Sequence, residues 1–193
     1  MPKAQNWLKK IREFAKEHKK LVVGVVVLIF AAFAVNVNAI RTQSEGTTKA
    51  AKSVSAQINK SFDFTALDNQ GKPTKSKIIF TISSAEKTNQ VMVNDKTYTA
   101  TNQKLFLILN LEYKNDTTTA LNIFPGDLIR LTYNNDDGNK FAPDLHNNLV
   151  PIAAISTKLD RVGFVVPNNV RNFKLFVGEL DGKKETIPVN FPS

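Results

Sequence analysis

The most acidic stretch of the chain, NNDDGNKFAPD at residues 134–144, contains residue types that could bind a calcium ion. Carboxylate and amide oxygens spaced around a glycine are the ligands of an EF-hand loop. With Gly138 placed sixth, Asp137 and Asp144 fall at positions five and twelve, but position one is Tyr133, which is not an EF-hand ligand. Because Asp-Gly between two strands is also typical of a hairpin turn, we expect a hairpin without metal and keep an irregular cation site as the alternative.

Two further patterns could support catalysis. Ser84 and Lys87 have the S-x-x-K spacing of serine acyl enzymes, in which the lysine lies one helical turn from the nucleophile. The accompanying S-D-N and K-T-G motifs are missing and the surrounding residues predict a strand, so we interpret the match as chance. His146 lies in a polar loop, and no second His or Cys follows the apolar run at 21–40, which favours a solvated side chain over a metal ligand.

The sequence therefore assigns no catalytic residue, no cofactor and no metal ligand. Residues 41–193 contain 15 acidic side chains, and any two of them could meet as a general acid and base, although no pair stands out. An envelope hydrolase that uses carboxylates stays open as an alternative to a non-catalytic protein.

The charge of the chain is concentrated at its N-terminus. The net charge is +9, but residues 1–20 hold seven basic and two acidic residues, whereas residues 41–193 hold 19 basic and 15 acidic residues spread over the domain. A nucleic-acid-binding protein concentrates its basic residues on one surface of the folded domain, so this distribution argues against that class. The chain has no cysteine, which excludes disulfides, thiolate metal sites and a cysteine-linked lipid anchor.

Residues 21–40, LVVGVVVLIFAAFAVNVNAI, form an uncharged apolar run. As a helix it would span roughly the 30 Å hydrocarbon core of a membrane. A cleaved signal peptide has a shorter apolar region followed by a small-x-small site, and cleavage near Ala39 is the alternative. The twenty residues before the run are long for a cleavable signal, so we expect a retained signal anchor.

Residues 1–20 also have a helical pattern. At 100° per residue, one stripe collects the apolar side chains and His18, while Lys, Arg and Glu fill the other side. Such an amphipathic helix lies along a lipid surface, and the expected partner is the lipid bilayer, which the chain crosses through residues 21–40. The positive-inside rule places this basic segment in the cytoplasm and the rest of the chain outside the cell membrane; a secreted product is the alternative.

The remaining chain divides into a stalk at 41–60, rich in Thr, Ser, Ala and Lys, and a domain at 61–193 whose apolar residues recur with a period of two. Short runs separated by turn residues predict strands at 62–66, 77–83, 90–93, 97–100, 105–114, 120–124, 128–133, 159–166, 173–177 and 186–191. The fold class we expect is all-β, an immunoglobulin-like β-sandwich with Greek-key connections, preceded by an N-terminal amphipathic and transmembrane helix and a short stalk. An open barrel is the structural alternative.

Alternation along the strands selects the residues that should form the core. They are Leu105, Leu107, Leu109, Leu111, Tyr113, Ile129, Leu131, Tyr133, Val162, Phe164, Val166, Phe173, Leu175, Val177, Ile187, Val189 and Phe191.

The strand chemistry between about residues 104 and 177 resembles the immunoglobulin-like domains of uncharacterised bacterial surface and secreted proteins, a group related to the mycobacterial immunoprotective extracellular protein. The matching features are a long apolar strand ending at Asn115, the turn Asp137-Gly138 followed by the aromatic Phe141, and a late strand with the ending F-x-x-P at 164–167. The resemblance implies a bacterial envelope protein. Many members are lipoproteins anchored through a Cys, which this chain lacks.

We therefore expect a single-pass, membrane-anchored, extracytoplasmic binding or scaffold module without catalysis. If three late strands are neighbours, their outward residues form one basic face with an exposed aromatic ring, which could meet an anionic envelope polymer or an acidic protein. A solvated sheet face without a partner is the alternative. The residues of this expected face are Arg161, Val165, Lys174, Phe176 and Lys184.

Overall fold

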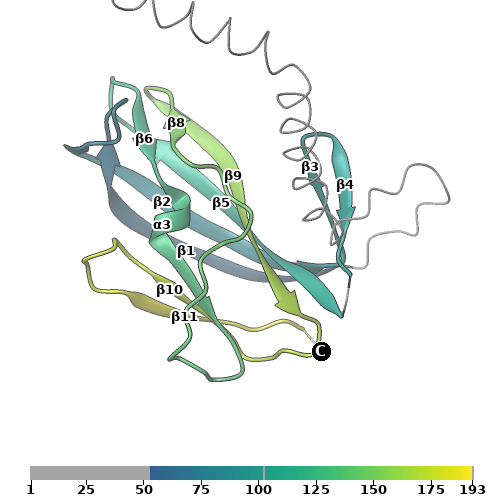
Figure 1. Ribbon diagram of the computed structural model, residues 1–193. Helices are drawn as coiled ribbons and strands as arrows, with labels where there is room; N and C mark the ends of the chain where they lie inside the picture. The colour runs from purple at the N-terminus through teal and green to yellow at the C-terminus, as the bar shows by residue number, and fades with distance from the viewer. Residues whose placement is uncertain (1–52, 102, 193) are drawn as a thin grey trace, which may run out of the picture. The chain divides into compact units, whose positions relative to one another are not determined.

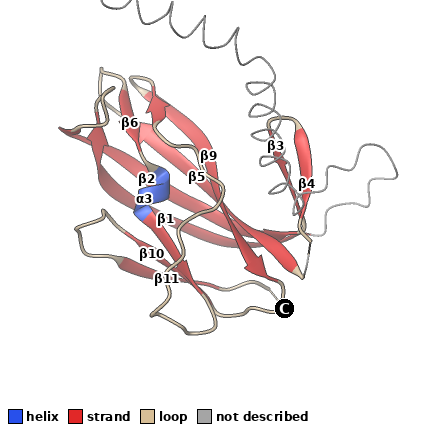
Figure 2. Cartoon of the chain, in the orientation of Figure 1, coloured by secondary structure: helices blue, strands red, loops and turns tan. Residues whose placement is uncertain are grey.

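The computed structural model describes residues 53–101 and 103–192. These residues form eleven β-strands and one helical turn, α3 (Pro125–Leu128), and every strand pairing is antiparallel (Figures 1 and 2). The expectation of an all-β domain is confirmed. The expected segments 1–20 and 21–40 lie outside the described residues.

Within the described part of the chain, no helix has the length and apolar character needed to cross a membrane.

The larger sheet has six strands in the order β8-β6-β1-β2-β5-β9. Its centre is built from long strands: β5 pairs along its whole length with β9 on one side, and from Phe106 to Lys114 with β2 on the other. The strands are β1 (Ser53–Leu67), β2 (Pro73–Thr88), β5 (Lys104–Asn115), β6 (Leu121–Ile123), β8 (Val150–Ile152) and β9 (Ser156–Pro167).

The smaller sheet has three strands in the order β11-β10-β7, namely β11 (Glu185–Val189), β10 (Phe173–Val177) and β7 (Ile129–Thr132). One continuous hydrophobic core includes side chains from both sheets, so the two sheets form a β-sandwich. A separate two-stranded hairpin, β3 (Gln90–Val93) and β4 (Lys96–Thr99), links β2 to β5 (Figure 1).

The core follows the alternation expected from the sequence. All of the residues predicted to face inward are buried in the core or packed against it. Aromatic rings join neighbouring strands at its centre: the ring centroids of Phe64 and Phe80 lie 5.3 Å apart, and those of Phe80 and Tyr113 also lie 5.3 Å apart. Such contacts add to the stabilisation from burial alone.

All ten predicted strands are present, but the stalk boundary is wrong and two short elements were missed. The strand β1 begins at Ser53, so the segment 53–60 belongs to the sheet and not to a stalk. The strand β8 and the helical turn α3 were not expected. The open-barrel alternative is not what the described residues form, since their strands divide into separate sheets.

Candidate functional site: a groove beside the β3–β4 hairpin

The hairpin β3–β4 is set by its turn. Val93 pairs with Lys96, so the loop consists of Asn94 and Asp95, which have φ angles of 50° and 60°. Two consecutive residues with positive φ are typical of a type I′ turn, whose twist matches that of the flanking strands, and Asn and Asp tolerate this conformation. The turn therefore fixes the register of a hairpin that is not part of either large sheet.

A groove with a volume of about 800 Å³ lies between β3, the outer faces of β5 and β9, and the loop at 144–147. We call it the hairpin groove. Its size falls in the range of pockets that bind small ligands or short peptide segments. Two exposed apolar side chains line it: Met92 on the hairpin, 59% exposed, and Leu159 on β9, 76% exposed. Large exposed apolar side chains gathered at a groove are typical of a binding surface.

The floor of the groove depends on Gly163. A Cβ atom at this position would lie 2.7 Å from Cδ1 of Ile108 and 3.3 Å from Cδ1 of Leu145, so both side chains close over the glycine. The loop at 144–147 is fastened to β9 here, because the N–H of Gly163 donates to the carbonyl of Leu145 at 2.7 Å and the N–H of Leu145 donates to the carbonyl of Gly163 at 3.0 Å. The Asp144 carboxylate accepts the N–H of Val165 at 2.7 Å.

Polar groups cross the floor in one row. Arg161 on β9 lies opposite Asn110 on β5, whose amide donates to the hydroxyl of Ser84 on β2 at 3.0 Å. Arg161 is exposed, and the described residues provide no hydrogen-bond or ion-pair partner for its guanidinium. This row offers a cation and an amide to a ligand in the groove.

Asp160 borders the groove on β9, but its side chain points to the opposite face of the sheet from Arg161 and is held by two donors. It accepts the Tyr113 hydroxyl at 3.0 Å and the Asn147 amide at 2.7 Å. Burial, together with the neighbouring Asp160 carboxylate, raises the pKa of Tyr113 far above its usual range, so the phenol is a fixed neutral donor. Asp144 and Asp160 therefore both have structural hydrogen bonds.

Among residues 53–101 and 103–192, no group of three His, Cys, Asp or Glu side chains could hold a metal ion. His146 is exposed; its ring packs over Gly126, and its Nδ1 lies 3.2 Å from the carbonyl of Asn147. The arrangement is suited to reversible binding through apolar contacts and hydrogen bonds.

The expected basic face is divided between two sheets. Arg161 and Val165 lie on β9, at the edge of the six-stranded sheet, whereas Lys174 and Phe176 lie on β10, in the three-stranded sheet, and Lys184 precedes β11. The premise that the three strands are neighbours is therefore wrong. Of the five residues, Arg161 lines the hairpin groove.

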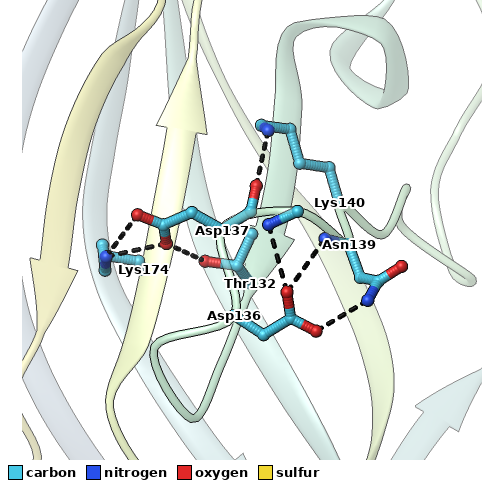
Figure 3. Close-up of polar contacts among 7 residues, drawn as sticks. Thr132, Asp136, Asp137, Asn139, Lys140 and Lys174 are labelled. Carbon is cyan, nitrogen blue, oxygen red and sulfur yellow. Dashed lines mark hydrogen bonds and ion pairs between the residues drawn. The ribbon is translucent and has the colours of Figure 1, made fainter.

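Three of the other residues have structural contacts. Lys174 forms an ion pair with Asp137, with its Nζ at 2.7 and 2.8 Å from the two carboxylate oxygens (Figure 3). The ring of Phe176 lies 5.0 Å from the Nζ of Lys140. Lys184 donates to carbonyls of its own turn, including that of Glu179.

The acidic loop at 134–144 folds back on β7, but its tight turn is at Asn134 and Asn135, with φ angles of 56° and 61°, and not at the expected Asp137-Gly138. Its ends are joined by paired backbone hydrogen bonds between Leu131 and Phe141, both 2.9 Å. Asp136 accepts the backbone N–H of Gly138 at 3.1 Å and the side-chain amide of Asn139 at 2.6 Å (Figure 3). Asn139 lowers the pKa of Asp136, and Lys174 lowers that of Asp137, each chiefly through its side-chain hydrogen bond. These carboxylates thus stabilise the turn itself.

The S-x-x-K tetrad lies within β2. Ser84 faces the outer side, where it accepts a hydrogen bond from Asn110, and Lys87 faces the opposite side, where its Nζ lies 4.4 Å from the ring centroid of Phe191. Residues three apart on a strand point to opposite faces, so the lysine cannot deprotonate the serine.

Sequence reasoning missed Met92, Leu159 and Gly163 as groove residues. Leu159 was placed in a strand, but its parity with Arg161 and Val165 already put it on the outer face. A large apolar residue on an outer face was the available signal for a binding surface.

No protein-family model matches the chain, and no curated protein sequence matches it. Among solved structures, the chain is similar to a conserved hypothetical protein from Bacillus anthracis, known from a 2.2 Å crystal structure, with 16% sequence identity and a TM-score of 0.45. The similarity covers 70% of this chain and 97% of that protein's chain.

Proposed function

We propose that the chain is a non-catalytic binding module of a bacterial cell envelope. In this proposal residues 21–40 anchor it in the membrane as a single span, residues 1–20 lie on the cytoplasmic surface, and the immunoglobulin-like sandwich faces outward. The ligand occupies the hairpin groove. The basic lead segment and the uncharged run of twenty residues support the anchor and its orientation.

The observation that carries the binding proposal is the hairpin groove. It is an open cleft of about 800 Å³ with apolar rims at Met92 and Leu159 and an accessible guanidinium at Arg161. A ligand could bury apolar surface and pair with the cation there, and both contributions favour binding. The carboxylates of Asp144 and Asp160, the two acidic residues that border the groove, are held by protein donors, which favours binding over catalysis.

Retention on envelope material tests the groove. Full-length chain, purified in detergent, should sediment with envelope fragments of a bacterium that expresses it. Met92→Asp places a charge at the apolar rim and should reduce this retention strongly. Leu180→Asp is the matched control, because Leu180 is 61% exposed, against 59% for Met92, and does not line the groove. Equal retention of both variants would exclude the groove, and no retention of the parent would exclude binding to the envelope.

The anchor is tested by the mass of the mature chain. Membrane fractions should contain a chain that begins near Met1 and resists carbonate washing, and protease added to intact cells should remove the domain while sparing residues 1–20. A product that begins at Ile40 would instead establish the secreted alternative, in which cleavage follows Ala39.

A second candidate, an envelope hydrolase, is favoured by one observation: Asp144 and Asp160 both border the groove, although the Asp160 side chain points to the opposite face of β9. A hydrolase would need them as acid and base. If it is correct, Asp144→Asn and Asp160→Asn should each abolish hydrolysis of envelope polymer while retention persists. Under the binding proposal, the purified parent chain releases no product from that polymer.

A further inference from the structure

The strand β9 has an open edge. Its residues alternate between bonding to β5 and pointing away from it, as in any antiparallel ladder. The N–H and carbonyl of Gly163 and the N–H of Val165 point away from β5, toward the loop at 144–147. By the same parity, Thr157, Leu159 and Arg161 direct their N–H and carbonyl groups to the edge, and the described residues provide no hydrogen-bond partner for these groups.

The open part of this edge has a boundary at each end. At one end the loop carrying Asp144 and Leu145 occupies the edge beside Gly163. At the other end the chain turns at Ile155, whose φ of 46° is left-handed and cannot continue a strand. The open segment thus runs from Thr157 to Arg161, and all three outward-bonding residues are exposed.

The other strand edges of the two large sheets have features that discourage pairing. The strands β8 and β11 contain Pro151 and Pro188. The edge of β1 has a bulge at Asn59, and Glu179 accepts the N–H of Thr65 at 2.9 Å. Phe141 bridges β7. Proteins protect sheet edges in these ways, whereas β9 presents Leu159, 76% exposed, at the middle of its open segment.

The open segment is self-complementary. If two copies pair antiparallel about a twofold axis at Leu159, Thr157 lies opposite the partner's Arg161, and Leu159 lies opposite the partner's Leu159. By symmetry, Arg161 also lies opposite the partner's Thr157, which makes three hydrogen-bonded pairs. Each pair exchanges two bonds, so about six bonds form. On the core-facing side of the sheet, Lys158 lies opposite the partner's Asp160, so opposite charges are placed near each other; within one chain Lys158 donates to the carbonyl of Pro151, and Asp160 accepts from Tyr113 and Asn147.

We propose that this edge is the interface with a second copy of the chain, joining two six-stranded sheets through β9. The pairing satisfies the open backbone groups and buries the most exposed large apolar side chain of the described residues, Leu159, against its counterpart. Confinement to a membrane raises the effective concentration of two copies, which suits so short an interface. The two hairpin grooves then lie on one face of a continuous sheet and can bind a repetitive polymer bivalently.

Single-cysteine variants of the full-length chain test the pairing, since the parent has no cysteine. Leu159→Cys places two thiols at the twofold axis, where Cα atoms of a hydrogen-bonded pair lie about 5.5 Å apart, within disulfide range. Ile155→Cys is the matched control, because Ile155 is 73% exposed, but its two copies would lie about 26 Å apart in this register.

Copper-phenanthroline oxidation of the full-length chain in membranes or detergent should give a disulfide-linked dimer for Leu159→Cys and none for Ile155→Cys. Mixed Thr157→Cys and Arg161→Cys chains should cross-link more than either variant alone, which establishes the antiparallel register. Leu159→Pro removes an N–H that does not bond to β5, so it should abolish association, read as the loss of the dimer in light scattering, while the melting temperature hardly changes.

Other results contradict the proposal. Equal cross-linking of Leu159→Cys and Ile155→Cys indicates random collision. A Leu159→Cys adduct with a mass other than twice that of the chain indicates a different protein at the edge. Absence of any adduct, with a monomer in light scattering, shows that the edge does not pair with a second copy.

Discussion

Asn115, the last residue of β5, offers a sharp test of how the strand ends are joined. The side chain is completely buried. Its amide nitrogen donates to the carbonyls of Thr119, Ala153 and Ile152 at 2.9, 3.0 and 3.3 Å, and its oxygen accepts from Thr117. Asn115→Asp keeps the size of the side chain but replaces the donor with an oxygen that faces three carbonyl oxygens.

The cost can be worked out from these contacts. Two donated hydrogen bonds are lost, at about 1–3 kcal/mol for each buried group left unsatisfied. The carbonyls of Thr119 and Ala153 keep the hydroxyls of Thr117 and Ser156 as donors. Repulsion between the new carboxylate and the carbonyls adds to this cost. We expect Asn115→Asp to lower the free energy of unfolding by about 4 kcal/mol, which at an m-value of about 2 kcal/mol/M lowers the urea midpoint by about 2 M.

Asn110→Asp is the matched control on the same strand. The Asn110 amide bonds to Ser84, whose hydroxyl can rotate and donate to the new carboxylate. The expected loss is therefore under about 1 kcal/mol. Urea unfolding of a fragment of residues 53–193, followed by far-ultraviolet circular dichroism, measures both variants. Equal urea midpoints for the two variants would refute the reasoning. So would a loss of stability in Asn115→Asp that becomes larger as the pH falls, since a protonated carboxyl regains a donor.

Three other predictions concern the domain. A fragment of residues 53–193 should fold. A fragment of residues 61–193 should melt at a lower temperature by circular dichroism, because it lacks Ala56, which is buried opposite Ala85. Identical melting temperatures would show that the first half of β1 is dispensable. Leu109→Asp should unfold the fragment, since Leu109 is fully buried and the charge costs several kcal/mol, whereas Leu109→Met should be tolerated; a cooperative melt for Leu109→Asp contradicts the core. Lys174 lowers the pKa of Asp137 below its ordinary value of 3.8, so the ion pair stabilises the fold above that pH, and this stabilisation is lost as the pH falls through the lowered pKa. The melting temperatures of the parent and of Asp137→Asn should therefore differ at pH 7 and converge in acid. A difference that stays constant with pH contradicts this assignment.

Strand patterning predicted the elements well where alternation and turn residues agree. The strands β3 and β10 have the predicted ends, because turn residues bound each of them and, in β10, buried positions alternate with half-buried ones. The first half of β1 was missed because its core-facing position at Ala56 meets Ala85, and closely packed small residues give a weak apolar signal. The strand β8 is only three residues long and has Pro151 at its centre, so it shows no apolar periodicity that would predict a strand.

The groove could not be predicted from local sequence in the same way. Its lining comes from β3, β5, β9 and the loop at 144–147, and it exists only because β9 pairs with β5 over their full length. The expected basic face was wrong for the same reason, since the sheet to which a strand belongs depends on distant pairings. What the sequence did contain was the outward direction of Arg161 and Val165, and the groove extends from that face.

The most direct test of the binding account is the oxidation of Met92 by hydroxyl radicals, with and without envelope fragments. Met92 lines the groove and is 59% exposed. A Leu180→Met variant provides a reference methionine at a position that is 61% exposed and outside the groove. Because thioether oxidation follows solvent access, the account predicts that Met92 oxidises more slowly in the bound chain while the introduced reference methionine is unaffected. Unchanged oxidation of Met92 in chain that has sedimented with the fragments would contradict it.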